Sequence, residues 1–135
     1  MTGTQREDIA KLEALYATNP DGRVFAHLAE AYRKAGELEQ AREVVEAGLK
    51  RHPGYASGHV VLGRICQGLG DGPGAEAAFR RVLELDPENL VALRALGDLL
   101  REDGRGGEAL PLYRQLLALD PGDEEVAAAI GAIEA

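Results

Sequence analysis

The sequence has few aromatic residues, one cysteine and no long apolar run. Aromatics make up 4% of the 135 residues and tryptophan is absent, so a core must be built from the aliphatic side chains that dominate the 45% apolar content. The lone cysteine, Cys66, cannot form an internal disulfide, which fits a reducing compartment. No stretch approaches the roughly 18 apolar residues of a membrane span, and the N-terminus lacks the basic and apolar parts of a signal peptide. We therefore expect a cytoplasmic protein without direct membrane insertion.

Positive charge is also scarce in this chain. It carries 15 Lys and Arg residues against 23 Asp and Glu residues, a formal net charge of −8. Because an acidic surface repels phosphate groups, we expect no nucleic-acid partner. The basic residues are mostly arginine, and together with the high alanine and glycine content this indicates a bacterium with a GC-rich genome.

Motifs of catalysis are missing as well. The chain contains no GxSxG, P-loop, HExxH or CxxC pattern. His27, His52 and His59 lack the spacing of metal ligands, and we expect His52 to be a solvated residue at a helix end. Cys66 is expected to be a buried small apolar side chain rather than a nucleophile. We therefore predict no enzymatic activity, no catalytic residue, no metal and no cofactor.

What the sequence does contain is a repeat with a period of 34 residues. Leucines, small residues and glycines recur at this step along most of the chain. The series are Leu28, Leu62 and Leu96; Ala29, Gly63 and Gly97; Gly36, Gly70 and Gly104; Ala41, Ala75 and Ala109; Val45, Phe79 and Tyr113; and Leu49, Leu83 and Leu117. Pro53, Pro87 and Pro121 keep the period, whereas Pro20 is one residue out of register. So many series with one step indicate a repeat architecture.

Each repeat has the pattern of two helices. Apolar residues in both halves follow the i, i+3, i+4 spacing of an amphipathic helix. A glycine (Gly36, Gly70 or Gly104) ends the first helix, as a left-handed C-terminal cap does, and a proline ends the second. Neither helix can bury its apolar face alone, so the repeats must stack. The small residues at positions such as Gly63 and Gly97 are expected to let neighbouring helices approach closely.

These residues resemble the tetratricopeptide repeat family, with the segment Ala109-Leu110-Pro111-Leu112-Tyr113 especially similar to its pattern. The resemblance implies an all-α fold, a right-handed superhelical α-α solenoid of antiparallel helix pairs. The expected organisation is one domain, with an N-terminal capping helix in 1–21, repeats at 22–55, 56–89 and 90–123, and a C-terminal capping helix in 124–135. The family also implies protein binding or scaffolding as the function.

The two ends carry separate expectations. Thr4 and Glu7 have the spacing of a capping box, and the stripe of Ile9, Leu12 and Leu15 is expected to cover the first repeat. The outer face of the last helix is unusually rich in alanine for a terminal cap, which normally needs a polar outer face. Either this helix is a small but adequate cap, or its outer face packs on another copy, on a partner, or on further sequence outside these 135 residues. The candidate end-to-end interface comprises Ala128, Ala132 and Ile133.

In this family the first helices line a concave groove in which peptides or helices bind. Carried over by position, the groove residues are Arg23, His27, Glu30, Arg33, Lys34, Val60, Val61, Arg64, Gln67, Gly68, Val91, Arg94, Asp98 and Arg101. Their basic excess on an acidic molecule predicts an acidic partner segment with small apolar residues, because arginine binds carboxylates in a bidentate way. Pairing of Glu30 with Lys34 and of Arg94 with Asp98 would reduce this excess. Arg33, Arg64 and Arg101 would then be left without a sequence-local acid.

Two functions remain open from the sequence. The favoured one is a non-enzymatic interaction module that binds a peptide or helix of a partner protein in the groove. The alternative is a scaffold that forms homo-oligomers through its terminal helices. A further oddity is the helix expected near 56–69, in which Gly58 and Gly68 have no packing reason that the sequence shows. Softness of this helix, or close approach of a partner backbone, would account for them.

Overall fold

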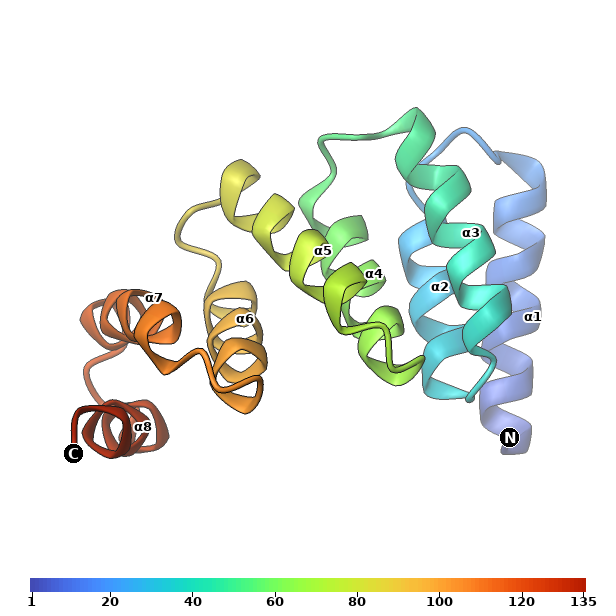
Figure 1. The fold of residues 1–135 in the computed structure, drawn as a ribbon. Helices are drawn as coiled ribbons and strands as arrows, with labels where there is room; N and C mark the ends of the chain where they lie inside the picture. The colour runs from blue at the N-terminus through green and yellow to red at the C-terminus, as the bar shows by residue number, and fades with distance from the viewer. The chain divides into compact units, whose positions relative to one another are not determined.

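The computed structural model describes all residues from 1 to 135 and is all-α, as predicted (Figure 1). Contacts divide the chain into two compact units, Met1–Ala78 and Phe79–Ala135, and the boundary falls within the fifth helix. The helices are α1 Gly3–Thr18, α2 Phe25–Lys34, α3 Leu38–Arg51, α4 Ala56–Gly68, α5 Gly72–Leu85, α6 Leu90–Glu102, α7 Gly106–Leu119 and α8 Glu124–Glu134.

Three glycines end first helices in the way that the sequence predicts. Gly36, Gly70 and Gly104 have φ angles of 84°, 76° and 76°, a region that other residues enter only with strain. The N–H group of the residue after each glycine donates to a carbonyl oxygen five residues earlier, at 2.8 Å in all three cases. These bonds satisfy carbonyl groups that a helix end leaves unpaired. The same cap thus ends α2, α4 and α6, each just before the next helix begins.

The core of the first unit is built around Phe25. Its ring is fully buried and lies against two glycines of neighbouring helices. A Cβ atom added to Gly48 would lie 2.1 Å from the ring, and one added to Gly58 would lie 3.2 Å from the ring and 2.7 Å from Leu49. A Cβ atom on Gly68 would lie 3.2 Å from the Leu38 side chain. The expectation that Gly58 and Gly68 lack a packing reason is therefore wrong.

The second unit also packs an aromatic ring over a glycine, but here the ring belongs to the second helix of the pair and the glycine to the first. Helices α6 and α7 pack closely against each other, and α8 packs on α7. The buried ring of Tyr113 on α7 lies over Gly97 on α6, where an added Cβ atom would come within 2.7 Å of it. Leu96, Leu100 and Leu116 complete an aliphatic core around this contact, each about 1% exposed. Gly97 therefore allows the close approach of helices that the repeat pattern predicts.

Helix α1 differs from its prediction in two respects. Its capping box is formed by Thr2 and Gln5, not by Thr4 and Glu7: the Gln5 N–H donates to Thr2 Oγ1 at 3.0 Å and the Thr2 N–H donates to Gln5 Oε1 at 2.8 Å. Of the expected apolar stripe only Ile9 is buried, while Leu15 is 56% exposed. Helix α1 packs on α2 but covers it incompletely.

Candidate functional site

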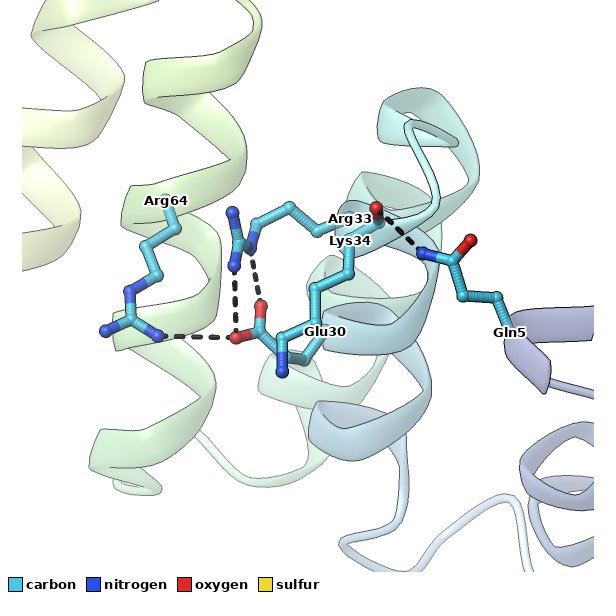
Figure 2. Close-up of polar contacts among 5 residues, drawn as sticks. All are labelled: Gln5, Glu30, Arg33, Lys34 and Arg64. Atoms are coloured by element: carbon cyan, nitrogen blue, oxygen red, sulfur yellow. Dashed lines mark hydrogen bonds and ion pairs between the residues drawn. The ribbon is translucent and has the colours of Figure 1, made fainter. Parts of the chain in front are cut away.

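A cluster of charged side chains joins the neighbouring first helices α2 and α4 (Figure 2). The carboxylate of Glu30 accepts from Arg33 Nε at 2.5 Å and from Arg64 Nη1 at 3.3 Å. Lys34 lies beside it on α2, and its carbonyl oxygen accepts from Gln5 Nε2 of α1 at 3.3 Å. Glu30, Arg33 and Arg64 are all half-buried, so the cluster combines structural pairing with access from solvent.

This pairing differs from the one expected from the sequence. Arg33 and Arg64 were expected to lack a nearby acid, and both instead contact Glu30. Arg33 contacts Glu30 within α2 at the i, i+3 spacing, which the pairing rules of a single helix already allow. Arg64 contacts Glu30 because it lies 34 residues later, and adjacent first helices place equal register positions side by side. Pairing rules confined to one helix cannot predict the contact between Arg64 and Glu30, whereas the 34-residue period could have predicted it.

The electrostatics of this cluster favour an ionised Glu30. Burial by itself would raise the pKa of the Glu30 carboxyl, but the hydrogen bond from Arg33 and the charges of Arg33, Arg64 and Lys34 lower it overall. One carboxylate therefore faces three basic side chains. The cluster keeps a surplus of positive charge, and we name Glu30, Arg33, Lys34 and Arg64 together the basic cluster.

Other predicted groove residues of the first unit have structural roles. The guanidinium group of Arg23 lies over the Tyr55 ring, 5.0 Å from its centre, a cation–π contact. Val61 is only 8% exposed and belongs to the core, so its prediction as groove floor is wrong; Val60 is half-buried and Gln67 is exposed. Gly68 is exposed, but a Cβ atom on it would contact the Leu38 side chain. Packing against Leu38 therefore explains this glycine, and close approach of a partner backbone is not needed to account for it.

In the second unit the predicted groove charges are engaged in bonds to other elements. Arg94 binds Asp123 through an ion pair and Glu125 at 3.6 Å, not Asp98. Asp98 instead accepts from the hydroxyl of Tyr113 at 2.6 Å. Burial, followed by this hydrogen bond, raises the pKa of Tyr113. The expected Arg94–Asp98 pair is thus wrong, because α7 and α8 offer partners that the sequence of α6 does not contain.

A shallow hollow of about 240 Å³ adjoins this bond. It is lined by Asp98, Arg101, Glu102 and Tyr113, and Arg101 is exposed on its rim. Val91 lies on the same helix and is 44% exposed. Two carboxylates against one guanidinium group give this hollow no positive surplus, unlike the basic cluster.

The larger concavity lies between α1 and α2 and was not predicted. It has a volume of about 650 Å³, and we name it the α1–α2 pocket. Its lining residues are Gln5, Asp8, Lys11, Leu12, Leu15, Val24, His27, Glu30, Ala31 and Lys34. Only His27, Glu30 and Lys34 were among the predicted groove residues. The available signal was the stripe of Leu12 and Leu15, which was interpreted as a cover for the first repeat.

The candidate end-to-end residues lie on α8. Ala128 and Ala132 are exposed, as that interpretation requires. Ile133 is half-buried, and its side chain lies 3.2 Å from where a Cβ atom on Gly106 of α7 would be. Ile133 therefore contributes to the α7–α8 contact, which makes Ala128 and Ala132 the freer part of this surface.

The side chains of Cys66 and His52, two residue types that often act in catalysis, pack against or bond to other parts of the chain. Cys66 is buried as predicted, and its burial, the largest cause, raises the pKa of the thiol. His52 is half-buried rather than solvated: its Nε2 lies 2.5 Å from the carbonyl oxygen of Asp21, and its ring stacks on Phe25. No set of three His, Cys, Asp or Glu side chains is arranged to hold a metal ion. None of the helices combines the length and apolar character needed to cross a membrane.

Two family models described as Tetratricopeptide repeat match this chain, over residues 22–65 and 61–124. The cellulose synthase operon protein C of Xanthomonas axonopodis pv. citri is 39% identical over 92 residues, 68% of this chain and 6% of that protein. The BBSome complex member bbs-4 of Caenorhabditis elegans is 36% identical over 72 residues, 53% of this chain and 16% of that protein.

Among solved structures, a thermophilic TPR protein of Thermus thermophilus, TTC0263, is similar with a TM-score of 0.80 and 27% identity. That similarity covers 98% of this chain and 74% of the Thermus chain. The chain spans only 6% to 22% of the length of the curated relatives that it matches. The similarity is therefore to a repeat segment of those proteins.

Proposed function

Because this chain belongs to the tetratricopeptide repeat family, we propose that it is a non-enzymatic interaction module that binds an acidic segment of a partner protein at the basic cluster. Repeat domains of this fold present first helices as a binding surface, and this chain places charged, accessible side chains there. One relative, bbs-4, is by name a member of a protein complex. That name is consistent with a role in binding other proteins.

The observation that carries the proposal is that more basic than acidic side chains gather at Glu30. Three basic side chains surround one carboxylate, and the side chains of Arg33 and Arg64 are 28% and 39% exposed. Arg33 and Arg64 use only some of their five N–H donors on Glu30, so donors remain for a second carboxylate. A partner segment with an aspartate or glutamate would complete this network.

The second unit supports the proposal less. Arg94 is bound to Asp123 and Glu125, and the hollow near Arg101 has more acids than bases. The acidic preference is therefore assigned to α2 and α4 alone.

A peptide-display selection tests this function. Random 12-residue peptides are selected on the full chain, and the retained sequences are compared with those retained by the double variant Arg33→Gln and Arg64→Gln. We expect enrichment of aspartate and glutamate on the wild type, loss of that enrichment on the double variant, and affinity for the selected peptides about tenfold lower, which is about 1.4 kcal/mol.

The matched control is Arg42→Gln on α3, since Arg42 also lies near two acids, Glu39 and Glu46, but belongs to a second helix. This variant should retain the acidic enrichment. Selection without acidic enrichment, or enrichment that the double variant keeps, would contradict the proposed function.

A further inference from the structure

Glu30 already uses donors of the two arginines to which the proposed acidic segment would bind (Figure 2). Its carboxylate accepts from Nε and Nη2 of Arg33, at 2.5 and 3.3 Å, and from Nη1 of Arg64 at 3.3 Å. The Nε and Nη2 atoms form one edge of the guanidinium group, and such an edge can bind a carboxylate in a bidentate way. Glu30 therefore holds a position of the same chemistry as the partner's carboxylate.

A second carboxylate at the remaining donors would lie close to Glu30. The side chain of Glu30 is 21% exposed, and both arginines beside it are also partly covered. Because water is partly excluded there, two carboxylates that share one guanidinium group repel each other more strongly than they would in open water. Glu30 thus weakens the binding of an acidic segment for as long as it keeps its charge and its position.

Glu30 has another basic residue within reach, Lys34. The two residues lie four apart on α2 with the glutamate first, which is the order that favours an ion pair on a helix. In the structure Glu30 forms its ion pairs with Arg33 and Arg64, while Lys34 acts on it through its charge. Both Glu30 and Lys34 line the α1–α2 pocket, so their side chains border the same open space. A change of the Glu30 rotamer would bring its carboxylate to the Lys34 ammonium group.

We propose that Glu30 is an internal competitor for the acidic segment, and that it moves from Arg33 and Arg64 to Lys34 when the segment binds. This inference rests on the function proposed above and assigns the residue that regulates it. The arginines keep the same number of carboxylate partners in the exchange, since the partner's carboxylate replaces that of Glu30. The exchange is favoured by the new ion pair between Glu30 and Lys34.

The other charges of the pocket do not oppose this movement. The α1–α2 pocket is lined by Asp8 and Lys11 in addition to Glu30 and Lys34, so acids and bases are equal in number there. Glu30 borders the pocket before and after the exchange, and the balance is unchanged. The positive surplus is then left at the two arginines, where the partner's carboxylate binds.

Substitution of Glu30 by glutamine tests the competition. Glu30→Gln keeps an oxygen that accepts from Arg33 and Arg64 but removes the charge that repels a second carboxylate. The probe is a fluorescein-labelled peptide of twelve residues with four central glutamates, and its counterpart has four glutamines. By fluorescence anisotropy at neutral pH, we expect the variant to bind the glutamate peptide at least threefold more tightly than wild type. A side chain that only joins α2 to α4 would affect stability without limiting affinity.

Glu39→Gln on α3 is the matched control. Glu39 pairs with Arg42 at the same i, i+3 spacing as Glu30 with Arg33, and its substitution changes the net charge by the same amount. It lies outside the basic cluster. Its affinity for the glutamate peptide should stay within twofold of wild type, which separates competition at the site from a general loss of negative charge.

Lys34→Gln, introduced into wild type and into Glu30→Gln, tests the movement to Lys34. The lysine charge attracts an acidic peptide in both backgrounds, but only in wild type does Lys34 also receive Glu30. We therefore expect the lysine change to weaken binding about twofold more in wild type than in Glu30→Gln. Equal weakening in the two backgrounds overturns the movement to Lys34.

The remaining outcomes separate this inference from the proposed function. Affinity of Glu30→Gln that is equal to or lower than that of wild type overturns the competition, and the proposed function stands if wild type still prefers the glutamate peptide. Absence of that preference in both proteins overturns the proposed function and this inference with it.

Discussion

Two glycines at the same register position, Gly97 on α6 and Gly131 on α8, show how differently the interior and the end of a repeat chain are treated. The ring of Tyr113 on the following helix covers Gly97, while Gly131 faces open space. Both lie in first helices, 34 residues apart. The residue type is the same, and the difference lies in whether the side chain of another helix packs over the glycine.

The comparison extends to the other end of the chain. Val45 and its counterpart Leu12 hold equivalent places in α3 and α1, and Val45 is fully buried while Leu12 is half-buried beside the pocket. Burial in such a chain is supplied by neighbouring repeats rather than by the helix itself. Residues at the two ends therefore keep the interior pattern but not the interior environment.

The largest expected effect comes from adding one methyl group to the two glycines. Gly97→Ala would place a Cβ atom 2.7 Å from the Tyr113 ring and force that ring to move. We expect a net loss of about 1–2 kcal/mol in unfolding free energy, since overpacking exceeds the gain in helix propensity. Urea denaturation at neutral pH measures it.

The matched change is Gly131→Ala, which meets no atom and should raise stability by up to about 1 kcal/mol through helix propensity alone. Equal changes in unfolding free energy for Gly97→Ala and Gly131→Ala would contradict the distinction between a covered and an open glycine.

An intermediate effect is expected at Tyr113, whose hydroxyl distinguishes it from Leu12 at the equivalent place in α1. Tyr113→Phe removes the 2.6 Å hydrogen bond to Asp98 and should lower the unfolding free energy by about 0.5–1.5 kcal/mol. The pKa of Tyr113 is raised in the folded state, so this contribution is present at neutral pH and is lost as the pH rises through that raised value. Denaturation curves from pH 7 upward should show the gap between wild type and variant closing.

The smallest effect is expected at Glu30. Residues at multiples of 34 positions after it include Arg64, in the interior of the repeat array, and Ala132, on the last helix. Glu30→Gln weakens the pairs with Arg33 and Arg64 and should lower the unfolding free energy by less than about 1 kcal/mol near neutral pH. Because the pKa of Glu30 is lowered from 4.5, its contribution is present above that value and is lost as the pH falls through the folded pKa. The variant should therefore lose less stability than wild type on acidification. A parallel loss in both proteins would argue against a stabilising cluster.

The fold could be predicted from the sequence because its rules are local or periodic. The left-handed glycines and the small residues over which aromatic rings pack all follow from one 34-residue step. Gly58 and Gly68 escaped prediction because their packing partners, Phe25 and Leu38, lie on other helices. The sequence of a single helix contains no information about them.

The candidate site was predicted less well for a related reason. Charges were paired within helices, at i, i+4, whereas the structure pairs Glu30 with Arg64 across helices and Arg94 with Asp123 across a loop. The α1–α2 pocket was missed because the apolar stripe of α1 was assumed to be fully buried. Periodicity tells which side chains share a face, but the presence of a covering neighbour must come from the fold.

Asp123 links the start of the last helix to α6 through an ion pair. One of its oxygens accepts from the Val126 N–H at the start of α8, and the other binds Arg94 on α6. Salt that screens the Arg94–Asp123 pair would weaken this link. The eleven residues of α8 would then be held by their packing on α7 and by the Arg114–Glu134 ion pair, and we expect them to become more open to a protease. The link between α8 and α6 is thus sensitive to ionic strength, whereas the contact of Val126 and Ala129 with α7 is apolar.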